Sequence, residues 1–324
     1  MIETKEIIKT LKDAKNIAIF AHRHPDADAY GSMFGLREIC RILGKDADIY
    51  AICNYSNDMT KIFNYDEIKS DFNPEAYDLV VFVDMHLQFR LDVEHVDLAM
   101  QVENKLCIDH HPIAETDVMV AEKAYVKQVA AACSQILCEI CQAENIEISP
   151  KLATYLWARL MGDTNRFLNS NVTPEVFECA KVLMQAGAEV QRVYEIMFKS
   201  MTMQQLQVKN TAARKLALRE NGRSAYIVFT IKDMKKLGID LDGVKRVSDL
   251  AIKLEGVEVA FLCTEYQKNH FKISMRSMEG VDVGAFAAKN GGGGHVCAAA
   301  FEIDATKRQL ISKLNDWCKE ILND

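Results

Sequence analysis

The stretch that most constrains the fold is a short apolar run that ends in a carboxylate and two imidazoles, Leu106-Cys107-Ile108-Asp109-His110-His111-Pro112. An apolar run of this length before a proline predicts a buried strand. In an open α/β sheet, ligands bind at the carboxyl ends of the strands. Side chains alternate along a strand, so without a turn we expect His110 and His111 to point apart, one toward a metal and one toward a substrate. Alone, the tripeptide is equally compatible with two surface histidines.

Two more predicted strands end in polar side chains that can bind a metal. Residues 16–21 are apolar and lead into the series His22, Asp26 and Asp28, before a predicted helix over 33–43. Residues 77–84 form a continuous apolar run that ends at Asp84. Imidazole mixed with carboxylate suits Mn²⁺ or another borderline divalent metal better than Ca²⁺. An Asp-x-Asp pair alone can also cap a helix, but three such strand ends predict one shared site.

Helices are predicted over residues 129–142 and 152–160, and the second runs into Gly162-Asp163-Thr164. An acidic side chain at the carboxyl end of a helix opposes the helix dipole. A nearby cation would relieve that conflict. Asp163 is therefore a further candidate metal ligand.

Composition limits the classes of protein to consider. The chain has 324 residues, 49% of them hydrophobic and 26% charged, which predicts a globular protein of two domains. No apolar run reaches membrane-spanning length, and the first residues carry charges instead of a secretory leader. Ten cysteines then indicate a reducing compartment, so we expect a cytoplasmic protein. A net charge of −7 argues against a protein that coats long nucleic acid.

A glycine run near the end of the chain, Gly291, Gly292, Gly293 and Gly294, is followed directly by His295. Successive glycines cost chain entropy, and one use for them is to let backbone N–H groups approach an anion. His295, with Arg276 and Ser277 at the end of a predicted strand over 270–275, would add hydrogen-bond donors. The run matches neither a Walker A loop nor GxGxxG. The alternative is a flexible hairpin.

Taken in order, these motifs resemble those of the DHH phosphoesterase superfamily. The resemblance is greatest to its nanoRNase/pAp-phosphatase branch, which carries a DHH-associated C-terminal domain. It implies an α/β fold with a Rossmann-like parallel-sheet catalytic domain over residues 1–190 and a helical linker over 191–221. A smaller α/β substrate-binding domain would follow over 222–324, with the active site in the cleft between the domains.

The resemblance also implies two Mn²⁺ ions, which Mg²⁺ or Co²⁺ could replace. His22 and Asp26 would hold one ion and Asp28, His110 and Asp163 the other, while Asp84 bridges both. His111 would contact the phosphate or protonate the leaving group, and Asp109 would orient an imidazole. The sequence departs from the family pattern at His86, which could be a ligand, a substrate contact or a bystander, and at Asn165, which replaces a common glycine.

The expected activity is hydrolysis of short oligoribonucleotides to mononucleotides, of 3′-phosphoadenosine 5′-phosphate (pAp) to AMP, or of linear or cyclic dinucleotides. The partners are then short single-stranded RNA or nucleotides, with no membrane and no long nucleic acid, and a homodimer is left open. Two alternatives remain at this point. One is an inorganic pyrophosphatase of the DHH type, and the other is a metal-binding regulatory protein without turnover.

Overall fold

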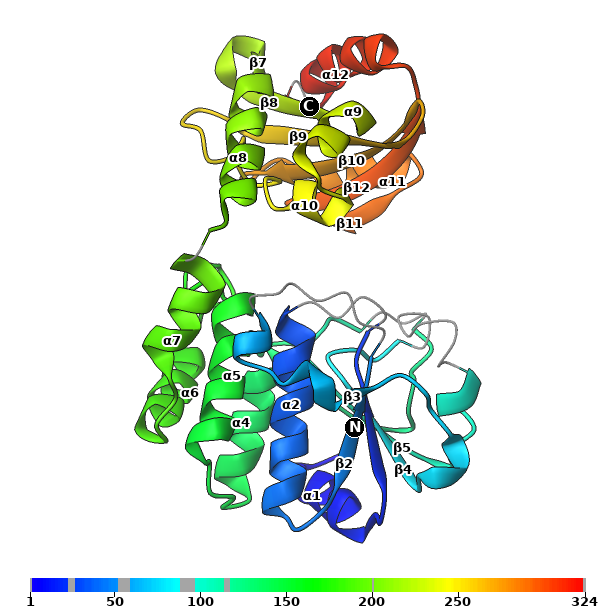
Figure 1. The fold of residues 1–324 in the computed structure, drawn as a ribbon, viewed down its shortest axis with the longest axis vertical. Helices are drawn as coiled ribbons and strands as arrows, with labels where there is room; N and C mark the ends of the chain where they lie inside the picture. Colours follow the sequence, from blue (N-terminus) through cyan, green and yellow to red (C-terminus); the bar gives the residue numbers. More distant parts are fainter. Residues whose placement is uncertain are drawn as a thin grey trace. The chain divides into compact units, whose positions relative to one another are not determined.

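Two six-stranded sheets, one in each half of the chain, carry the residues singled out above (Figure 1). The computed structural model describes residues 2–22, 27–51, 59–87, 97–113, 117–199 and 201–322. It divides the chain into two compact units, Met1–Ser200 and Met201–Asp324.

The first unit is built on a parallel sheet with the strand order β3-β2-β1-β4-β5-β6. Its central strands are runs of Val, Ile, Leu and Phe buried on both faces, as parallel strands require. The strand order reverses between β1 and β4, which is where ligands bind in open α/β sheets. The strand bounds are β1 (Ile17–Phe20), β2 (Ala47–Tyr50), β3 (Ile68–Lys69), β4 (Leu79–Val83), β5 (Asn104–Asp109) and β6 (Lys123–Val126). The predicted parallel sheet is confirmed.

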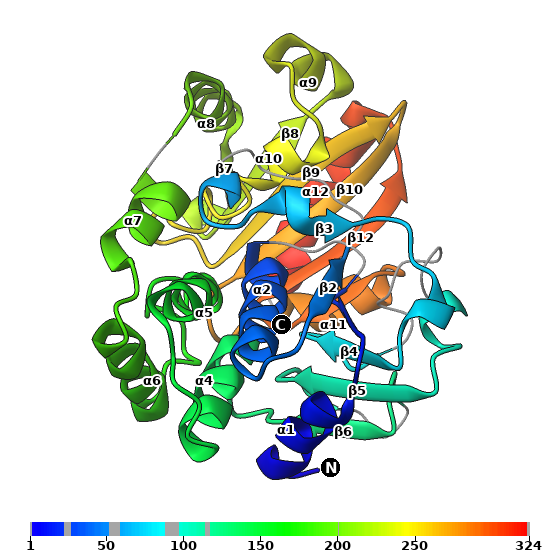
Figure 2. The ribbon, with the colours of Figure 1, turned by 60° about the horizontal axis from the view of Figure 1, so that its bottom comes forward.

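Three helices next to this sheet position the candidate site. They are α2 (Ala27–Ile42), α4 (Cys133–Ala143) and α5 (Pro150–Asp163), which gather on one side of the sheet in Figure 2. Their buried side chains share one core with α1 (Thr4–Asp13) and one face of the strands. α2 begins at Ala27, earlier than predicted, so Asp28 belongs to its first turn.

The helices α2 and α5 pack closely because α2 presents two glycines to its neighbour. A Cβ atom added at Gly35 would lie 2.7 Å from Leu156 Cδ2, and one added at Gly31 would lie 2.8 Å from Arg159 Cβ. Such distances lie inside van der Waals contact, so only glycine permits this approach. The packing fixes α5, and therefore its last residue Asp163, against the sheet.

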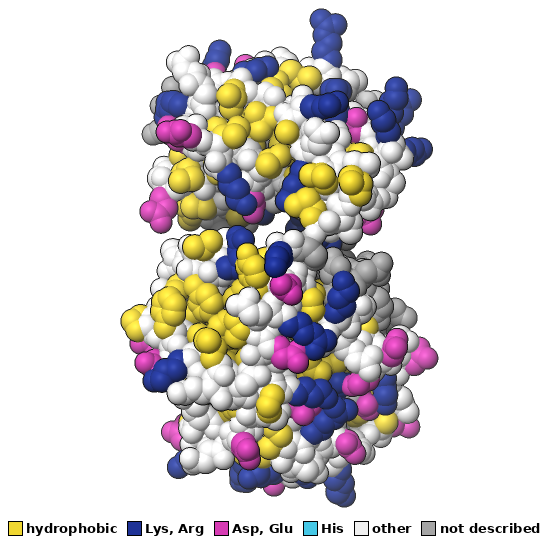
Figure 3. Space-filling model, turned by 60° about the vertical axis from the view of Figure 1, so that its left-hand side comes forward, with side chains coloured by type: hydrophobic (Ala, Val, Ile, Leu, Met, Phe, Trp, Pro, Cys, Tyr) yellow, Lys and Arg dark blue, Asp and Glu magenta, His cyan; other side chains and the backbone are white. Residues whose placement is uncertain are grey.

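Two further helices of the first unit are α6 (Pro174–Gln185) and α7 (Val190–Tyr194). On α6, Phe177 and Met184 each expose 57% of their surface. Figure 3 shows hydrophobic side chains gathered on the face of this unit that carries α6. Among the described residues, no helix combines the length and the apolar character that crossing a bilayer requires.

The second unit has a mixed sheet with the order β11-β12-β10-β9-β8-β7. Only the β8–β9 pair is parallel among its pairings. Helices α11 (Val283–Lys289) and α12 (Lys307–Leu322) cover one face, and α8 (Met203–Lys215), α9 (Ile231–Leu237) and α10 (Leu241–Lys245) pack on part of the other. The strands are β7 (Ala217–Arg219), β8 (Ser224–Phe229), β9 (Val259–Gln267), β10 (His270–Ser277), β11 (Gly293–His295) and β12 (Ala298–Asp304). The predicted smaller α/β domain is confirmed as a fold.

Candidate active site

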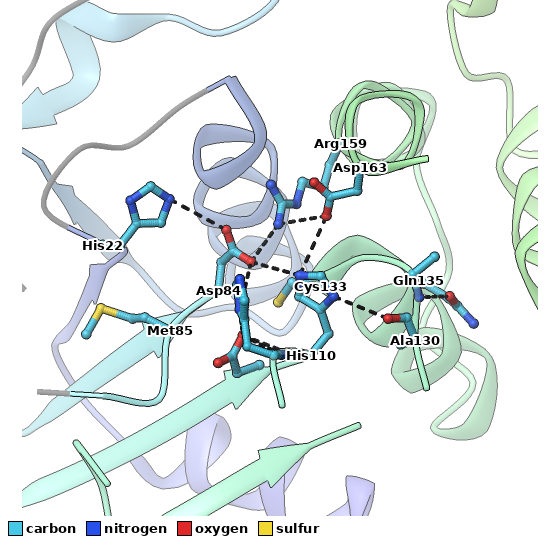
Figure 4. A network of polar contacts seen from close by, with 12 residues as sticks. His22, Asp84, Met85, His110, Ala130, Cys133, Gln135, Arg159 and Asp163 are labelled. Atoms are coloured by element: carbon cyan, nitrogen blue, oxygen red, sulfur yellow. Dashed lines mark hydrogen bonds and ion pairs between the residues drawn. The ribbon is translucent and has the colours of Figure 1, made fainter. Parts of the chain in front are cut away.

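Three neighbouring strand ends deliver polar side chains to one edge of the parallel sheet. Asp84 directly follows β4, Asp109 is the last residue of β5, and His22 lies just beyond β1. Since β4 lies between β1 and β5, these residues meet, and the Asp84 N–H donates to the Ile108 carbonyl oxygen at 3.0 Å. Figure 4 shows the resulting polar network.

Asp84 is the centre of this network. Its backbone adopts a left-handed conformation, with φ of 61°, which a short polar side chain tolerates and which turns the chain at the end of β4. The carboxylate is buried, with Oδ1 3.3 Å from His110 Nε2 and Oδ2 3.8 Å from His22 Nε2. Burial raises the pKa of Asp84, and the charge of Asp163 raises it further. The carboxylate therefore needs cationic partners to stay ionised.

The two histidines do not point to opposite sides. β5 ends at Asp109, so strand alternation does not extend to His110 and His111, and their ring centroids lie 4.5 Å apart. Asp84 Oδ1 lies 3.9 Å from His111 Nδ1 as well as near His110. The separation expected from alternation is absent because the chain turns immediately after the strand.

His110 is oriented as a metal-binding imidazole usually is. Its Nδ1 lies 3.2 Å from the Ala130 carbonyl oxygen, an arrangement in which Nδ1–H donates and Nε2 is left as the coordinating atom. That Nε2 lies 3.7 Å from Asp163 Oδ2 as well as near Asp84. Burial lowers the pKa of His110, but the hydrogen bond to Asp84 and the surrounding negative charge outweigh burial and raise it to about 9.

Asp109 is fully buried and holds its neighbours in place. Its Oδ1 accepts the His110 N–H at 2.7 Å and lies 2.8 Å from His111 Nδ1. Its Oδ2 lies 2.5 Å from His86 Nδ1. Burial alone would raise its pKa, but the hydrogen bonds with His111 and His86 lower it to about 2. With both oxygens bonded to the chain, Asp109 is placed to orient imidazoles, and the one it orients near Asp84 is His111.

His86, whose role the sequence left open, is buried, with only 1% of its surface exposed. Besides Asp109 it approaches Asp117, with Nε2 3.3 Å from Oδ2. It therefore lies between two carboxylates behind the histidine pair, in neither a surface position nor one facing Asp84.

Arg159 is the site residue that sequence reasoning missed. Its Nη2 lies 2.5 Å from Asp84 Oδ1 and 2.8 Å from Asp163 Oδ2. Asp163 is the last residue of α5, so the cation that an acid at this helix end requires is present in the chain itself. A signal was available, since residues four apart on a helix are neighbours and Arg159 precedes Asp163 by four.

The backbone of the turn after Asp163 explains why asparagine can replace the common glycine at position 165. Asn165, Arg166 and Phe167 have φ values of 46°, 63° and 64°, all left-handed. Glycine adopts this conformation without cost, and asparagine tolerates it better than most residues. The Thr164 hydroxyl stabilises the turn by accepting the Phe167 N–H at 3.1 Å.

The described residues include one group that could hold a metal ion, with ligand atoms of Asp84, Asp109, His110 and His111 all within 4.8 Å of one another. Buried carboxylates and an imidazole whose Nε2 lies close to them fit a borderline divalent cation. Asp26 lies outside the described residues, as does the side chain of Asp28. That Asp26 and Asp28 are metal ligands therefore remains a prediction.

A separate cavity of about 340 Å³ lies on the sheet of the second unit. Alternation along β10 brings Lys272, Ser274 and Arg276 to the same face, where they line it together with Lys245 of α10. Three cationic side chains therefore line the cavity, and one of them, Arg276, donates from Nε to Asp249 Oδ1 at 3.0 Å. Sequence reasoning found Arg276 and missed the two lysines, although the spacing Lys272-x-Ser274-x-Arg276 was a readable signal. Other lining residues are Leu241, Ser248, Leu262, Thr264, Gly293, Gly294, Ala298, Ala299 and Ala300.

Gly293 and Gly294 form strand β11 with His295, and β11 pairs antiparallel with β12. A Cβ atom at Gly292 would lie 2.1 Å from the Ala300 oxygen, and one at Gly294 would lie 2.5 Å from the Ala298 oxygen. Close packing on β12 thus accounts for these two glycines, whereas Gly293 has open space around it.

Ser277 lies on the opposite face of β10 from Arg276. Its hydroxyl donates to the Val281 carbonyl oxygen at 2.6 Å, and the residue is not among those that line the cavity. The side chain of His295 lies outside the described part of the chain. The roles of Ser277 and His295 in binding remain predictions.

Two family models match the chain. Residues 16–160 match the N-terminal domain of the DHH family, and residues 223–320 match the DHHA1 domain. The first match contains Asp84, Asp109, His110 and His111, and the second contains the whole cavity of the second unit.

Relatives of similar length extend the comparison over nearly the whole chain. The chain is 27% identical to the bifunctional oligoribonuclease and PAP phosphatase NrnA of Mycoplasma genitalium, covering 98% of this chain and 97% of that protein. It is 25% identical to the Bacillus subtilis protein of the same name, covering 97% and 98%. A crystal structure of an exopolyphosphatase-related protein from Bacteroides fragilis shares the fold, with a TM-score of 0.89, 19% identity, and coverage of 99% and 97%. The chain belongs to the DHH phosphoesterase superfamily, in its nanoRNase branch.

Proposed function

We propose that this protein is a metal-dependent phosphoesterase that hydrolyses short oligoribonucleotides to mononucleotides and pAp to AMP. Linear or cyclic dinucleotides are further candidate substrates. The observation that carries the proposal is the convergence of Asp84, His110, His111 and Asp163 at the edge of the parallel sheet. The full-length similarity to proteins named oligoribonuclease and PAP phosphatase supports the choice of substrate class.

The proposed cofactor is a pair of divalent cations, and Mn²⁺ is the preferred metal. His22 and Asp26 would hold one, and Asp28, His110 and Asp163 the other. Asp84 is suited to bridge them because its two oxygens face different partners, His110 on one side and His22 on the other. Bound divalent metal supplies activated water and charge stabilisation at the scissile phosphate.

The chain's own residues would orient the substrate and move the proton. Asp109 fixes the ring of His111 through Nδ1, so the other ring nitrogen, Nε2, is the one available to a substrate, and the side chain is 26% exposed. In this position His111 can contact a phosphate oxygen or donate a proton to the leaving oxygen. Because Asp109 is buried and bonded on both oxygens, the ring keeps one orientation.

The cavity of the second unit would bind a second anionic group of the substrate. Arg276, Lys272 and Lys245 supply positive charge, and Gly293 and Gly294 of β11, which follow Gly292, line the same cavity. Ser277 and His295 complete the proposed set.

The test is a turnover assay with Mn²⁺ on a ribonucleotide trimer, pAp and inorganic pyrophosphate. We expect hydrolysis of the trimer and of pAp, with pyrophosphate the poorest substrate. Preference for pyrophosphate would favour the pyrophosphatase alternative. Absence of turnover on all three, in protein that binds Mn²⁺, would favour a regulatory protein.

A further inference from the structure

Arg159 places a permanent positive charge inside the candidate metal centre. The side chain is buried in α5, with only 2% of its surface exposed, and its Nη2 contacts both Asp84 Oδ1 and Asp163 Oδ2. Figure 4 shows the guanidinium reaching between these two carboxylates beside His110. An arginine stays charged at any physiological pH.

The atoms that Arg159 contacts are spaced as ligands of a single ion. Asp84 Oδ1 lies 3.3 Å and Asp163 Oδ2 lies 3.7 Å from His110 Nε2. Oxygen and nitrogen donors lie about 2.0–2.2 Å from a small divalent cation, so neighbouring donors around one ion are separated by roughly 3–3.5 Å. Nη2 of Arg159 is therefore in direct contact with two of the three atoms that an ion on the His110 side would use.

The stem of Arg159 cannot move away from this position. Its Cβ lies where α2 passes at Gly31, so closely that a Cβ atom on that glycine would be only 2.8 Å away. Because only 2% of the residue is exposed, the surrounding side chains keep the guanidinium near the carboxylates. A divalent ion entering on this side has to displace the guanidinium and then bind beside it.

The side of Asp84 that faces His22 differs from the His110 side in its contacts with Arg159. Oδ2 of Asp84 faces His22, with Nε2 at 3.8 Å, whereas the Arg159 contact is to Oδ1. An ion held by His22 and Oδ2 would not have to break the bonds that Arg159 makes. The two halves of the candidate centre are thus unequal in this chain.

We propose that Arg159 is a resident cation that competes with divalent metal on the His110 side of Asp84, so that the ion on this side binds more weakly than the ion on the His22 side. This inference rests on the metal centre of the proposed function. One ion stays bound at low free Mn²⁺, and the second binds only as the concentration of free Mn²⁺ rises.

The experiment is a Mn²⁺ titration of the full chain, followed by calorimetry and by the electron paramagnetic resonance signal of free Mn²⁺. For the unaltered protein we expect two binding steps that differ by at least about tenfold in Kd, since like charges a few ångströms apart repel strongly. Arg159→Met, which keeps the length and removes the charge, should tighten the weaker step by about tenfold or more. Arg159→Lys, which keeps the charge, should leave that step weak.

A stability measurement supports the same test. Without metal, Arg159→Met leaves Asp84 and Asp163 facing each other, so its Tm should fall and added Mn²⁺ should raise it more than in the unaltered protein. Two equal binding steps in the unaltered protein would overturn the inference even if Arg159→Met failed to fold. Equal steps with normal turnover would leave the proposed function standing, and unequal steps without turnover would refute that function alone.

Discussion

His86 Nδ1 lies 2.5 Å from Asp109 Oδ2, and the other oxygen of the same carboxylate lies 2.8 Å from His111 Nδ1. The three side chains form a continuous chain from the buried interior to the edge of the sheet. His86 thus holds the carboxylate of Asp109 in one orientation, and Asp109 in turn holds the ring of His111.

His86→Ala should weaken catalysis without removing metal. The change leaves one oxygen of a fully buried carboxylate without its imidazole partner, so Asp109 and with it His111 lose their fixed position. Losses from removing such supporting hydrogen bonds are about 10–100-fold, and we expect this range in kcat. His86→Asn, whose amide can donate from nearly the same place as Nδ1, should recover most of the activity. Equal kcat for both variants and the unaltered protein would show that His86 is a bystander.

His111→Ala should lose most turnover while both ions still bind. A positioned proton donor or phosphate contact is worth about 10²–10⁴-fold in rate, and the Nδ1 atom of His111 is bonded to Asp109 instead of being free for a metal. Metal content by elemental analysis, alongside kcat, tests this. An ion missing from the variant would make His111 a ligand, a result compatible with its 3.9 Å approach to Asp84.

Arg276→Ala should act mainly through KM on short substrates. Arg276 lines the cavity of the second unit, remote from the metal centre in sequence and in chemistry, and a charge-assisted hydrogen bond is worth about 10–100-fold in affinity. Arg308→Ala, an exposed position on α12, is the matched control and should change neither constant. A fall in kcat with unchanged KM would place Arg276 in the chemical step instead.

Substrate length offers a separate prediction from the same cavity. A second anion site of limited size suits a short substrate, so activity per chain end should fall steeply as oligoribonucleotides grow beyond a few residues. The measurement compares chains from dinucleotide to long single strand at equal concentration of ends. Rates independent of length would favour a processive exonuclease.

Asp78 should make the stability of the first unit depend on pH. Its carboxylate accepts the backbone N–H of Lys15 at 2.9 Å and of Asn16 at 2.8 Å, which joins the start of β1 to β4. Burial would raise the pKa of Asp78, but these hydrogen bonds lower it below the ordinary value. A lowered folded-state pKa gives stability that is present at neutral pH and lost as pH falls through that pKa, below about pH 4.

Asp78→Ala should therefore lower the free energy of unfolding by about 2 kcal/mol at pH 7. The difference from the unaltered protein should shrink in acid, as followed by urea unfolding across pH. Asp78→Asn, which accepts a hydrogen bond without charge, should show an intermediate difference at pH 7 that also shrinks in acid, because the unaltered protein then loses the contribution of its carboxylate. A constant difference for Asp78→Ala down to pH 2 would contradict this assignment.

The strands of the first sheet and the polar residues at their ends could be predicted from the sequence, because both depend on local patterns. Residues 79–83 and 106–108 are apolar throughout, and each run is followed directly by an aspartate, Asp84 or Asp109. The order of the strands then follows from the α/β architecture, and it brings Asp84, Asp109 and His110 together.

Other parts of the site depend on contacts between distant residues. Arg159 meets Asp84 across 75 positions of the chain, and His86 meets Asp117 across 31. No local pattern encodes either pair. The direction in which the His111 side chain points depends on which residue is the last of β5. An apolar run in the sequence does not determine the end of a strand to the exact residue. The glycines at 292 and 294 needed the position of β12 to be understood as packing residues.

In the proposed function, Asp84 is the ligand shared by both metal ions of a centre that hydrolyses phosphate esters in short RNA. The most direct measurement is release of mononucleotides from a ribonucleotide trimer by the unaltered protein and by Asp84→Asn, each stripped of metal and then supplied with Mn²⁺. We predict turnover that requires Mn²⁺ in the unaltered protein and none in the folded variant. Full activity in Asp84→Asn, or in protein free of divalent metal, would contradict the account.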